Sequence, residues 1–119
     1  MTYNDIYLTA LTYLGEVSSS SAVSDYSDRA EYLMCGVVSE LMNISEAIGT
    51  KAELPSGKIT KTAEFPLDTR LAPAAALLLA SGLTAHEHTE LSDKLRENAN
   101  IQLSSIAFAD IHPILEVYD

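Results

Sequence analysis

The sequence has one cysteine, few basic residues and only isolated glycines, and each shortage excludes a class of protein. With Cys35 alone, the chain forms no internal disulfide and no cysteine-based zinc site. Seven Lys and Arg residues stand against seventeen Asp and Glu, which gives a formal net charge of −10. Because nucleic acids and anionic membranes are bound largely through basic side chains, we expect neither sequence-specific nucleic-acid binding nor membrane binding.

The chain also lacks the motifs of common enzymes. Its five glycines stand singly, so no Gly-rich loop is available to hold a phosphate. Nothing places a serine at a strained turn beside a histidine and an aspartate. Cys35 lies in an acidic stretch that would not stabilise a thiolate. We therefore expect no catalytic residue and no cofactor, and we interpret the protein as a non-enzyme.

One segment resembles a metal site, namely His86-Glu87-His88 followed by Glu90. Zinc hydrolases place two histidines four residues apart on one helix face, whereas these two are separated by two positions. In a helix they would diverge by about 200°. The remaining histidine, His112, belongs to a different element. The sequence therefore predicts a solvated first helical turn and no metal site.

What the sequence does contain is enough apolar residues for one core. At 119 residues and 47% hydrophobic, it predicts a single domain covering residues 1–119. The first residues carry no basic charge and no long apolar run, so we expect no signal peptide. The sequence thus predicts an intracellular, soluble, acidic domain.

Hydrophobic periodicity predicts four helices. Thr2 and Asp5 form a capping pattern for the first helix, and Ser24 caps the second after a polar linker of four serines, 18–21. The third helix has no charged residue and is too short to span a bilayer, so we expect it at the centre of the bundle. The predicted ranges are about 3–14, 24–48, 71–83 and 85–107.

The segment 50–68 lacks a helical period. A turn signal at Pro55-Ser56-Gly57, flanked by alternating residues, predicts a short hairpin or an extended arm. Basic residues gather in and just after it, at Lys51, Lys58, Lys61 and Arg70. Two interpretations stay open: a solvated connection, or a contact surface for an acidic neighbour.

The last residues, 108–119, differ from the fourth helix in being apolar and in containing Pro113. Because the residue before a proline disfavours the helical region, the sequence predicts an extended C-terminal tail. Such a tail docks either on its own subunit or on a neighbour. The fold class is thus all-α: a small bundle of about four helices with an extended or hairpin-like arm and an extended tail.

These elements follow a recognisable order: a short first helix with a glycine (6–15), a long second helix (30–48), an Ala/Leu-rich third helix (71–83) and an amphipathic fourth (91–106). The order resembles the head–tail connector, or head-completion adaptor, proteins of tailed bacteriophages and prophages. The resemblance implies a structural protein of the virion, assembled in the bacterial cytoplasm. It implies a ring of identical subunits under the portal protein, extending the DNA channel and binding the next tail component.

Under this resemblance the acidic charge suits a channel through which DNA slides without binding. The arm, near 59–65, is expected to accept the tail of a neighbouring subunit. The predicted interface residues are Lys51, Lys58, Ile59, Lys61, Phe65, Ile114, Val117 and Tyr118.

A second interpretation of the sequence is a small acidic protein-binding module, such as a phage-encoded inhibitor or a DNA mimic. It predicts a small soluble oligomer that binds a basic host protein tightly. The two interpretations differ in partner, because only the connector is expected to bind a portal protein.

Overall fold

The computed structural model describes residues 1–14, 20–50, 59, 62–85 and 88–116, and the side chains among them except those of 20–27 and 107–116. The described residues form four α-helices and no strand, as the sequence predicts for the fold class. The elements are α1 (Tyr3–Leu14), α2 (Ser20–Ala47), the short 3-10 helix η1 (Thr69–Leu71), α3 (Ala72–Thr84) and α4 (Thr89–Glu116).

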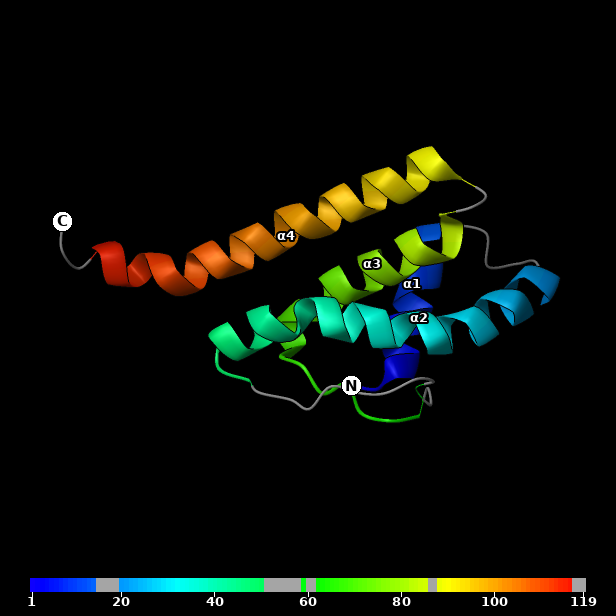
Figure 1. Cartoon of the computed structure of the whole chain (residues 1–119), viewed down its shortest axis with the longest axis horizontal. Helices are drawn as coiled ribbons and strands as arrows, with labels where there is room; N and C mark the ends of the chain where they lie inside the picture. The colour runs from blue at the N-terminus through cyan, green and yellow to red at the C-terminus, as the bar shows by residue number, and fades with distance from the viewer. Residues whose placement is uncertain (15–19, 51–58, 60–61, 86–87, 117–119) are drawn as a thin grey trace.

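Helix α3 lies at the centre of the bundle, as predicted. It contacts α1, α2 and α4, which surround it in Figure 1. All of its residues are buried except Pro73 and Gly82. Pro73 stands in the first turn, where its missing N–H has no helical partner to lose. The many alanines of α3 allow the neighbouring helices to approach closely.

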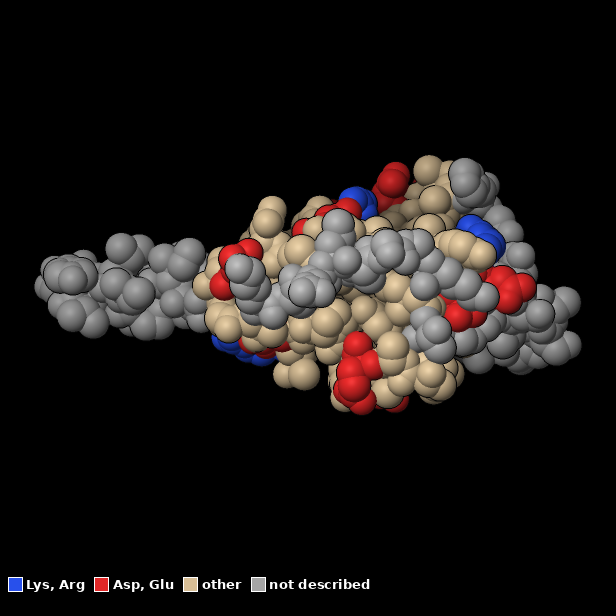
Figure 2. Space-filling view, turned by 60° about the horizontal axis from the view of Figure 1, so that its bottom comes forward, with Lys and Arg blue, Asp and Glu red and all other residues tan. Residues whose placement is uncertain are grey.

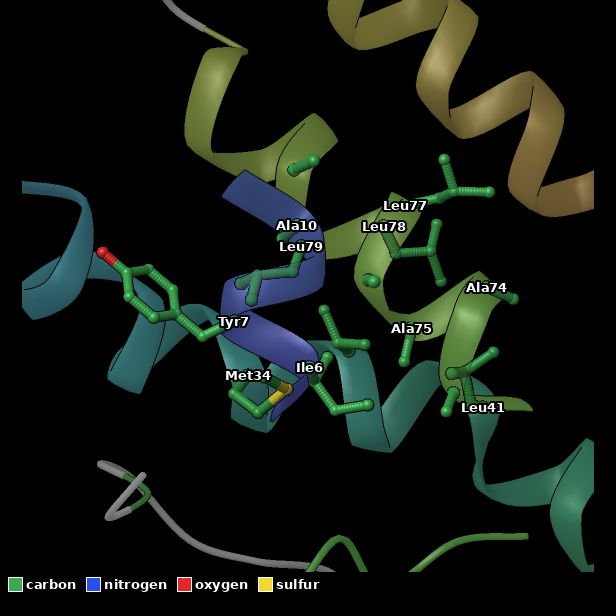
Figure 3. Close-up of a cluster of buried hydrophobic side chains, with 14 of the residues drawn as sticks. Ile6, Tyr7, Ala10, Met34, Leu41, Ala74, Ala75, Leu77, Leu78 and Leu79 are labelled. Atoms are coloured by element: carbon green, nitrogen blue, oxygen red, sulfur yellow. The ribbon is translucent and has the colours of Figure 1, made fainter. Parts of the chain in front are cut away.

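The core consists of apolar side chains from all four helices and from the arm, and Figure 3 shows the part formed by α1, α2 and α3. Ile6 and Tyr7 from α1 meet Met34 and Leu41 from α2 over the face of α3 that carries Ala75. Burial of apolar surface stabilises a fold by about 25 cal/mol per Å². A helix buried on all sides, such as α3, therefore holds the other three together.

Helix α1 has the boundaries that the sequence predicts, because its cap is local. The Thr2 N–H donates to Asp5 Oδ2 at 2.8 Å, and the Asp5 N–H donates to Thr2 Oγ1 at 3.3 Å. This reciprocal capping box satisfies two backbone donors that the helix itself leaves unpaired. The hydrogen bonds from Thr2 also hold the pKa of the Asp5 carboxyl below its usual value.

Helix α2 begins earlier than predicted. It starts at Ser20, within the four serines assigned to a linker, rather than at Ser24. Serine is only a moderately poor helix former. Since propagation of an existing helix costs far less than nucleation, the long helix α2 can extend by one more turn through Ser20 and Ser21.

Helix α4 is shifted towards the C-terminus relative to the prediction. It begins at Thr89 instead of Ala85, and it runs to Glu116 where the sequence predicted an extended tail from Phe108. Pro113 therefore lies inside the helix. The residue before a proline disfavours helical geometry without forbidding it, and a helix that is already long tolerates the loss.

The segment between α2 and η1 is described at 48–50, at Ile59 and at 62–68, and the predicted turn at 55–57 lies outside the described residues. The part at 62–68 bends at Ala63 and Leu67. It forms an isolated antiparallel bridge between Thr2 and Glu64, which joins it to the N-terminus of the chain.

Candidate subunit interface

The predicted interface residues divide into two groups. Ile59 and Phe65 have described side chains, and both are buried, at 7% exposure each. Ile114 lies in α4 at a position whose side chain is not described. The others fall outside the described residues: Lys51, Lys58, Lys61, Val117 and Tyr118.

Phe65 packs against the start of α1 in its own chain. Its N–H donates to the carbonyl oxygen of Met1 at 2.9 Å, and the Tyr3 N–H donates to the Ala63 carbonyl oxygen at 3.0 Å. The rings of Phe65 and Tyr3 meet edge to face, with centroids 6.0 Å apart and planes at 84°. One backbone edge of the arm is therefore occupied by the N-terminus.

Ile59 is held in the same way by α2. Its N–H donates to the Glu31 carbonyl oxygen at 2.9 Å, and its side chain joins the core. Burial raises the pKa of the core residue Tyr3, which packs against Phe65. In this structure the side chains of Ile59 and Phe65 thus belong to the core of their own chain and are not exposed to a neighbour's tail.

Arg70, the last residue of the basic cluster, forms hydrogen bonds with Asp68 at the end of the arm. Its backbone N–H and Nε donate to Asp68 Oδ1 at 2.9 and 3.1 Å, and its Nη2 lies 3.0 Å from Asp68 Oδ2. Nη2 also donates to the carbonyl oxygen of Ile48 at the end of α2, at 3.0 Å. These hydrogen bonds lower the pKa of Asp68 to about 2. Much of the Arg70 charge is therefore matched within the chain.

A buried serine completes this junction. The hydroxyl of Ser45, which is fully buried, donates to the Thr50 carbonyl oxygen at 2.9 Å and accepts from the Asp68 N–H at 3.1 Å. The Thr50 hydroxyl donates to Asp68 Oδ2 at 3.3 Å. The two ends of the arm are thus fixed to the C-terminal end of α2, which sets where α3 begins.

An open apolar groove of about 230 Å³ runs between α1 and the start of α3. Its floor is formed by the buried residues Ile6 and Ala72. Its walls include Met1, Thr9, Tyr13, Thr69 and Pro73. Met1 and Tyr13 are large apolar side chains that stay 54% and 40% exposed. None of the lining side chains is charged, so the groove suits an apolar partner rather than a polar ligand.

Sequence reasoning missed this groove. The available signal was Tyr13, which the periodicity of the first helix leaves beside rather than within its apolar stripe. The partner wall, from Thr69 to Pro73, joins α1 only in the folded chain. No local sequence pattern indicates that these two parts of the chain contact each other in the fold.

Helix α4 projects beyond the body of the protein. Figure 1 shows its C-terminal end, orange to red, extending past the ends of α2 and α3. Its first half packs on α3, where Leu95, Ala99 and Leu103 are buried. Arg96 Nη2 also reaches Glu40 Oε1 on α2 at 2.7 Å, an exposed pair. The contacts that hold α4 to the body therefore lie before residue 107 among the described side chains.

Acidic side chains are spread over the surface rather than gathered in one site. On the face shown in Figure 2, the described acidic side chains form several separate red patches. His88 is exposed, whereas His86 and Glu87 lie outside the described residues. Within the part of the chain that the structure describes, no group of three or more His, Cys, Asp or Glu is placed to hold a metal ion.

Among the described residues, no helix combines the length and the apolarity that crossing a bilayer requires. Comparisons of the chain with protein-family models, curated proteins and solved structures found no match. Three features of the molecule therefore indicate its function: the groove beside α1, the projecting end of α4 and the acidic exterior.

Proposed function

We propose that the protein is a head–tail connector subunit of a tailed bacteriophage or prophage. Copies of the chain form a ring under the portal protein, extend the DNA channel and bind the next component of the tail. The protein is a structural part of the virion and is assembled in the cytoplasm of the bacterial host. It needs no catalytic residue and no cofactor for this role.

The projecting end of α4 is the observation that carries the proposal. Residues 107–116 read AFADIHPILE, which is mostly apolar, and they continue a helix beyond the helices that pack beside it. A soluble monomer rarely presents contiguous apolar surface to water. An apolar sequence on a helix that continues beyond its neighbours is suited to pack against another subunit.

The order of the helices and the charge are consistent with the same role. The sequence elements that resemble connector proteins form one bundle around α3. The net charge of −10 and the scattered carboxylates would repel DNA phosphates and keep a channel free of tight contacts.

The test is co-expression with the portal protein encoded in the same genome. We expect a complex that survives size-exclusion chromatography, with the mass of several copies per portal by light scattering. Negative-stain images should show an added ring on one end of the portal. A portal protein that fails to bind the chain in this assay, under conditions where it forms its own ring, contradicts the proposal.

The net charge also favours the second interpretation, a small acidic module that binds a basic host protein. The same preparation separates the two. Tight, salt-sensitive binding to a basic bacterial protein, with no binding to the portal, supports the module. Salt-resistant binding to the portal supports the connector, because an apolar contact depends little on ionic strength.

A further inference from the structure

We infer that the groove between α1 and the start of α3 accepts the projecting C-terminal end of α4 from a second copy of the chain. The inference rests on the proposed function, which requires the chain to associate with itself. It replaces the predicted acceptor, because Ile59 and Phe65 are buried in their own subunit and one edge of their segment is paired with the N-terminus.

The groove has the chemistry of an acceptor for an apolar helix. Ile6 and Ala72 make an apolar floor, and Tyr13 and Pro73 leave apolar surface at its rim. Thr9, which α1 contributes to the lining together with Tyr13, has its hydroxyl turned back to donate to the Asp5 carbonyl oxygen at 2.8 Å. That hydroxyl therefore needs no partner from the groove's occupant.

Charge argues that the occupant is a second copy. Two chains of net charge −10 repel each other, so they associate most readily through surfaces that carry no charge. In α1 the only charged residue is Asp5, and α3 has none. In the projecting part of α4, residues 107–116, the charged residues are Asp110 and Glu116, two among ten. The groove and the end of α4 are thus two weakly charged surfaces of an acidic chain.

The length and spacing of the segment also fit. The ten residues 107–116 add about 15 Å of helix, comparable to the two turns of α1, from Ile6 to Tyr13, that line the groove. Positions 108, 111 and 115 fall on one face of a helix and hold Phe, Ile and Leu. They form the kind of apolar row that packs into a groove.

The contact is heterologous, because the row and the groove belong to different elements of the chain. Each copy offers its α4 end to one neighbour and its groove to another. A contact of this kind closes into a ring when the rotation between copies allows it, and otherwise propagates as a filament. It therefore supplies the association that a connector ring requires.

The first test is a disulfide between copies. With Cys35→Ser as the background, Tyr13→Cys and Leu115→Cys are purified separately with tags of different mass, mixed, added to the portal protein and oxidised. We expect a cross-linked product of one chain of each kind, at about tenfold or more the yield of either homodimer. Leu8→Cys replaces Tyr13→Cys in the matched control, since Leu8 is 51% exposed on α1 but does not line the groove.

The second test adds charge to the groove. Thr9 lines it and Thr12 does not, yet both are exposed on α1 and both hydroxyls donate to the carbonyl oxygen four residues earlier. Thr9→Asp should lower the amount of protein bound in the ring by about tenfold or more. Thr12→Asp should leave it near the wild-type amount. Circular dichroism melting confirms that both variants fold.

The outcomes separate this inference from the proposed function. A ring on the portal in which Tyr13→Cys and Leu115→Cys fail to cross-link, and which takes up Thr9→Asp normally, overturns the docking and leaves the connector intact. Cross-linking between copies in solution without any binding to the portal supports the docking and overturns the connector. Cross-linking of Leu8→Cys as strongly as Tyr13→Cys means a non-specific contact and overturns the docking.

Discussion

Ser81 and Ser92 lie opposite each other in the contact between α3 and α4. Each hydroxyl donates to the backbone carbonyl oxygen of the other residue at 2.8 Å, and both side chains are buried. A buried hydroxyl without a partner is costly, so this exchange is satisfied only when the two helices sit in one register. The pair therefore fixes where α4 begins its run along α3.

We expect Ser81→Ala and Ser92→Ala each to lower the free energy of unfolding by about 1–2 kcal/mol, because each removes one buried hydrogen bond to a backbone carbonyl oxygen and the contact between the two hydroxyls. The double variant should lose less than the sum of the two single losses. Urea denaturation of the four proteins measures the coupling. Strictly additive losses would show that the two hydroxyls act independently.

Asp68 gives the protein a dependence on acid. The hydrogen bonds from Arg70 lower its pKa from 3.8 to about 2. The ionised carboxylate therefore stabilises the fold fully when the pH is above the pKa that this group has in the unfolded chain. That stabilisation falls as the pH drops from about 4 towards 2. Asp68→Asn should therefore cost about 1–2 kcal/mol near pH 7 and progressively less towards pH 2.

The measurement is urea denaturation of Asp68→Asn and the wild type at several pH values. Glu64→Gln is the control, since the Glu64 side chain is 77% exposed and its pair with the N-terminal amine should contribute little. A stability difference between Asp68→Asn and wild type that stays constant across the acid range would contradict a role for the ionised carboxylate.

At this scale the sequence predicts only what is local. Thr2 and Asp5 stand three residues apart, so their cap is visible in the sequence. Ser45 and Asp68 are separated by 23 residues, and no pattern in the sequence indicates that they meet. Ile59 and Phe65 are also far along the chain from the residues they contact. Their alternating pattern therefore predicted an arm but not the surface on which the arm packs.

Among the elements, α3 is the one on which the bundle depends. Leu78 is 3% exposed near the middle of this helix. Leu78→Asp would bury an unpaired carboxylate at a cost of several kcal/mol, comparable to the stability of a small domain. We expect the variant to lose its helical signal or to melt far below the wild type by circular dichroism.

Ile101→Asp is the matched control, because Ile101 is 61% exposed on α4. It should melt within a few degrees of the wild type, since exposed substitutions rarely change stability by more than about 0.5 kcal/mol. If Leu78→Asp behaves like this control, α3 cannot be the central helix.

Gly36 offers a different test on α2. It is exposed, and a Cβ atom added there would have no atom within 4 Å. Gly36→Ala should therefore raise the free energy of unfolding by about 0.5–1 kcal/mol, measured by urea denaturation, because alanine forms helices better. The small size of this glycine would also let a helix of another subunit approach α2 closely. Normal uptake into the portal complex excludes a close contact there, and reduced uptake by the stabilised variant reveals one.

Helical periodicity was a reliable guide to the number and order of the elements and a weaker guide to their ends. α1 has the predicted bounds, since the capping residues Thr2 and Asp5 lie at its start in the sequence. α2 and α4 run past local stop signals, at Ser20 and Pro113, because a long helix extends at little cost per residue. Local signals therefore mark where a helix is weak rather than where it must end.

For the whole molecule, the informative change is removal of the end of α4. A chain ending at Ile106 should keep most of its helical signal and melt within a few degrees of the wild type, because Leu95, Ala99 and Leu103 still pack on α3. It should fail to join the portal complex. Melting by circular dichroism and size-exclusion chromatography with the portal give the two readings.

Either opposite result is informative. Full incorporation of the shortened chain contradicts a role for the end of α4 in assembly. Loss of the folded state would mean that these last residues belong to the core of their own subunit, and the groove beside α1 would then need another occupant.

Because of the way α4 is attached, a small change in its direction produces a larger displacement of its C-terminal end. The helix packs mainly on α3, and the serine exchange at Ser92 fixes it close to its start. Beyond Leu103, the last buried side chain described on α4, the helix continues to Glu116 for about 20 Å, so a bend of about 10° there displaces the tip by about 3 Å. A change in helix direction that leaves the packing of α3 and α4 intact therefore becomes a larger displacement at the far end of the molecule.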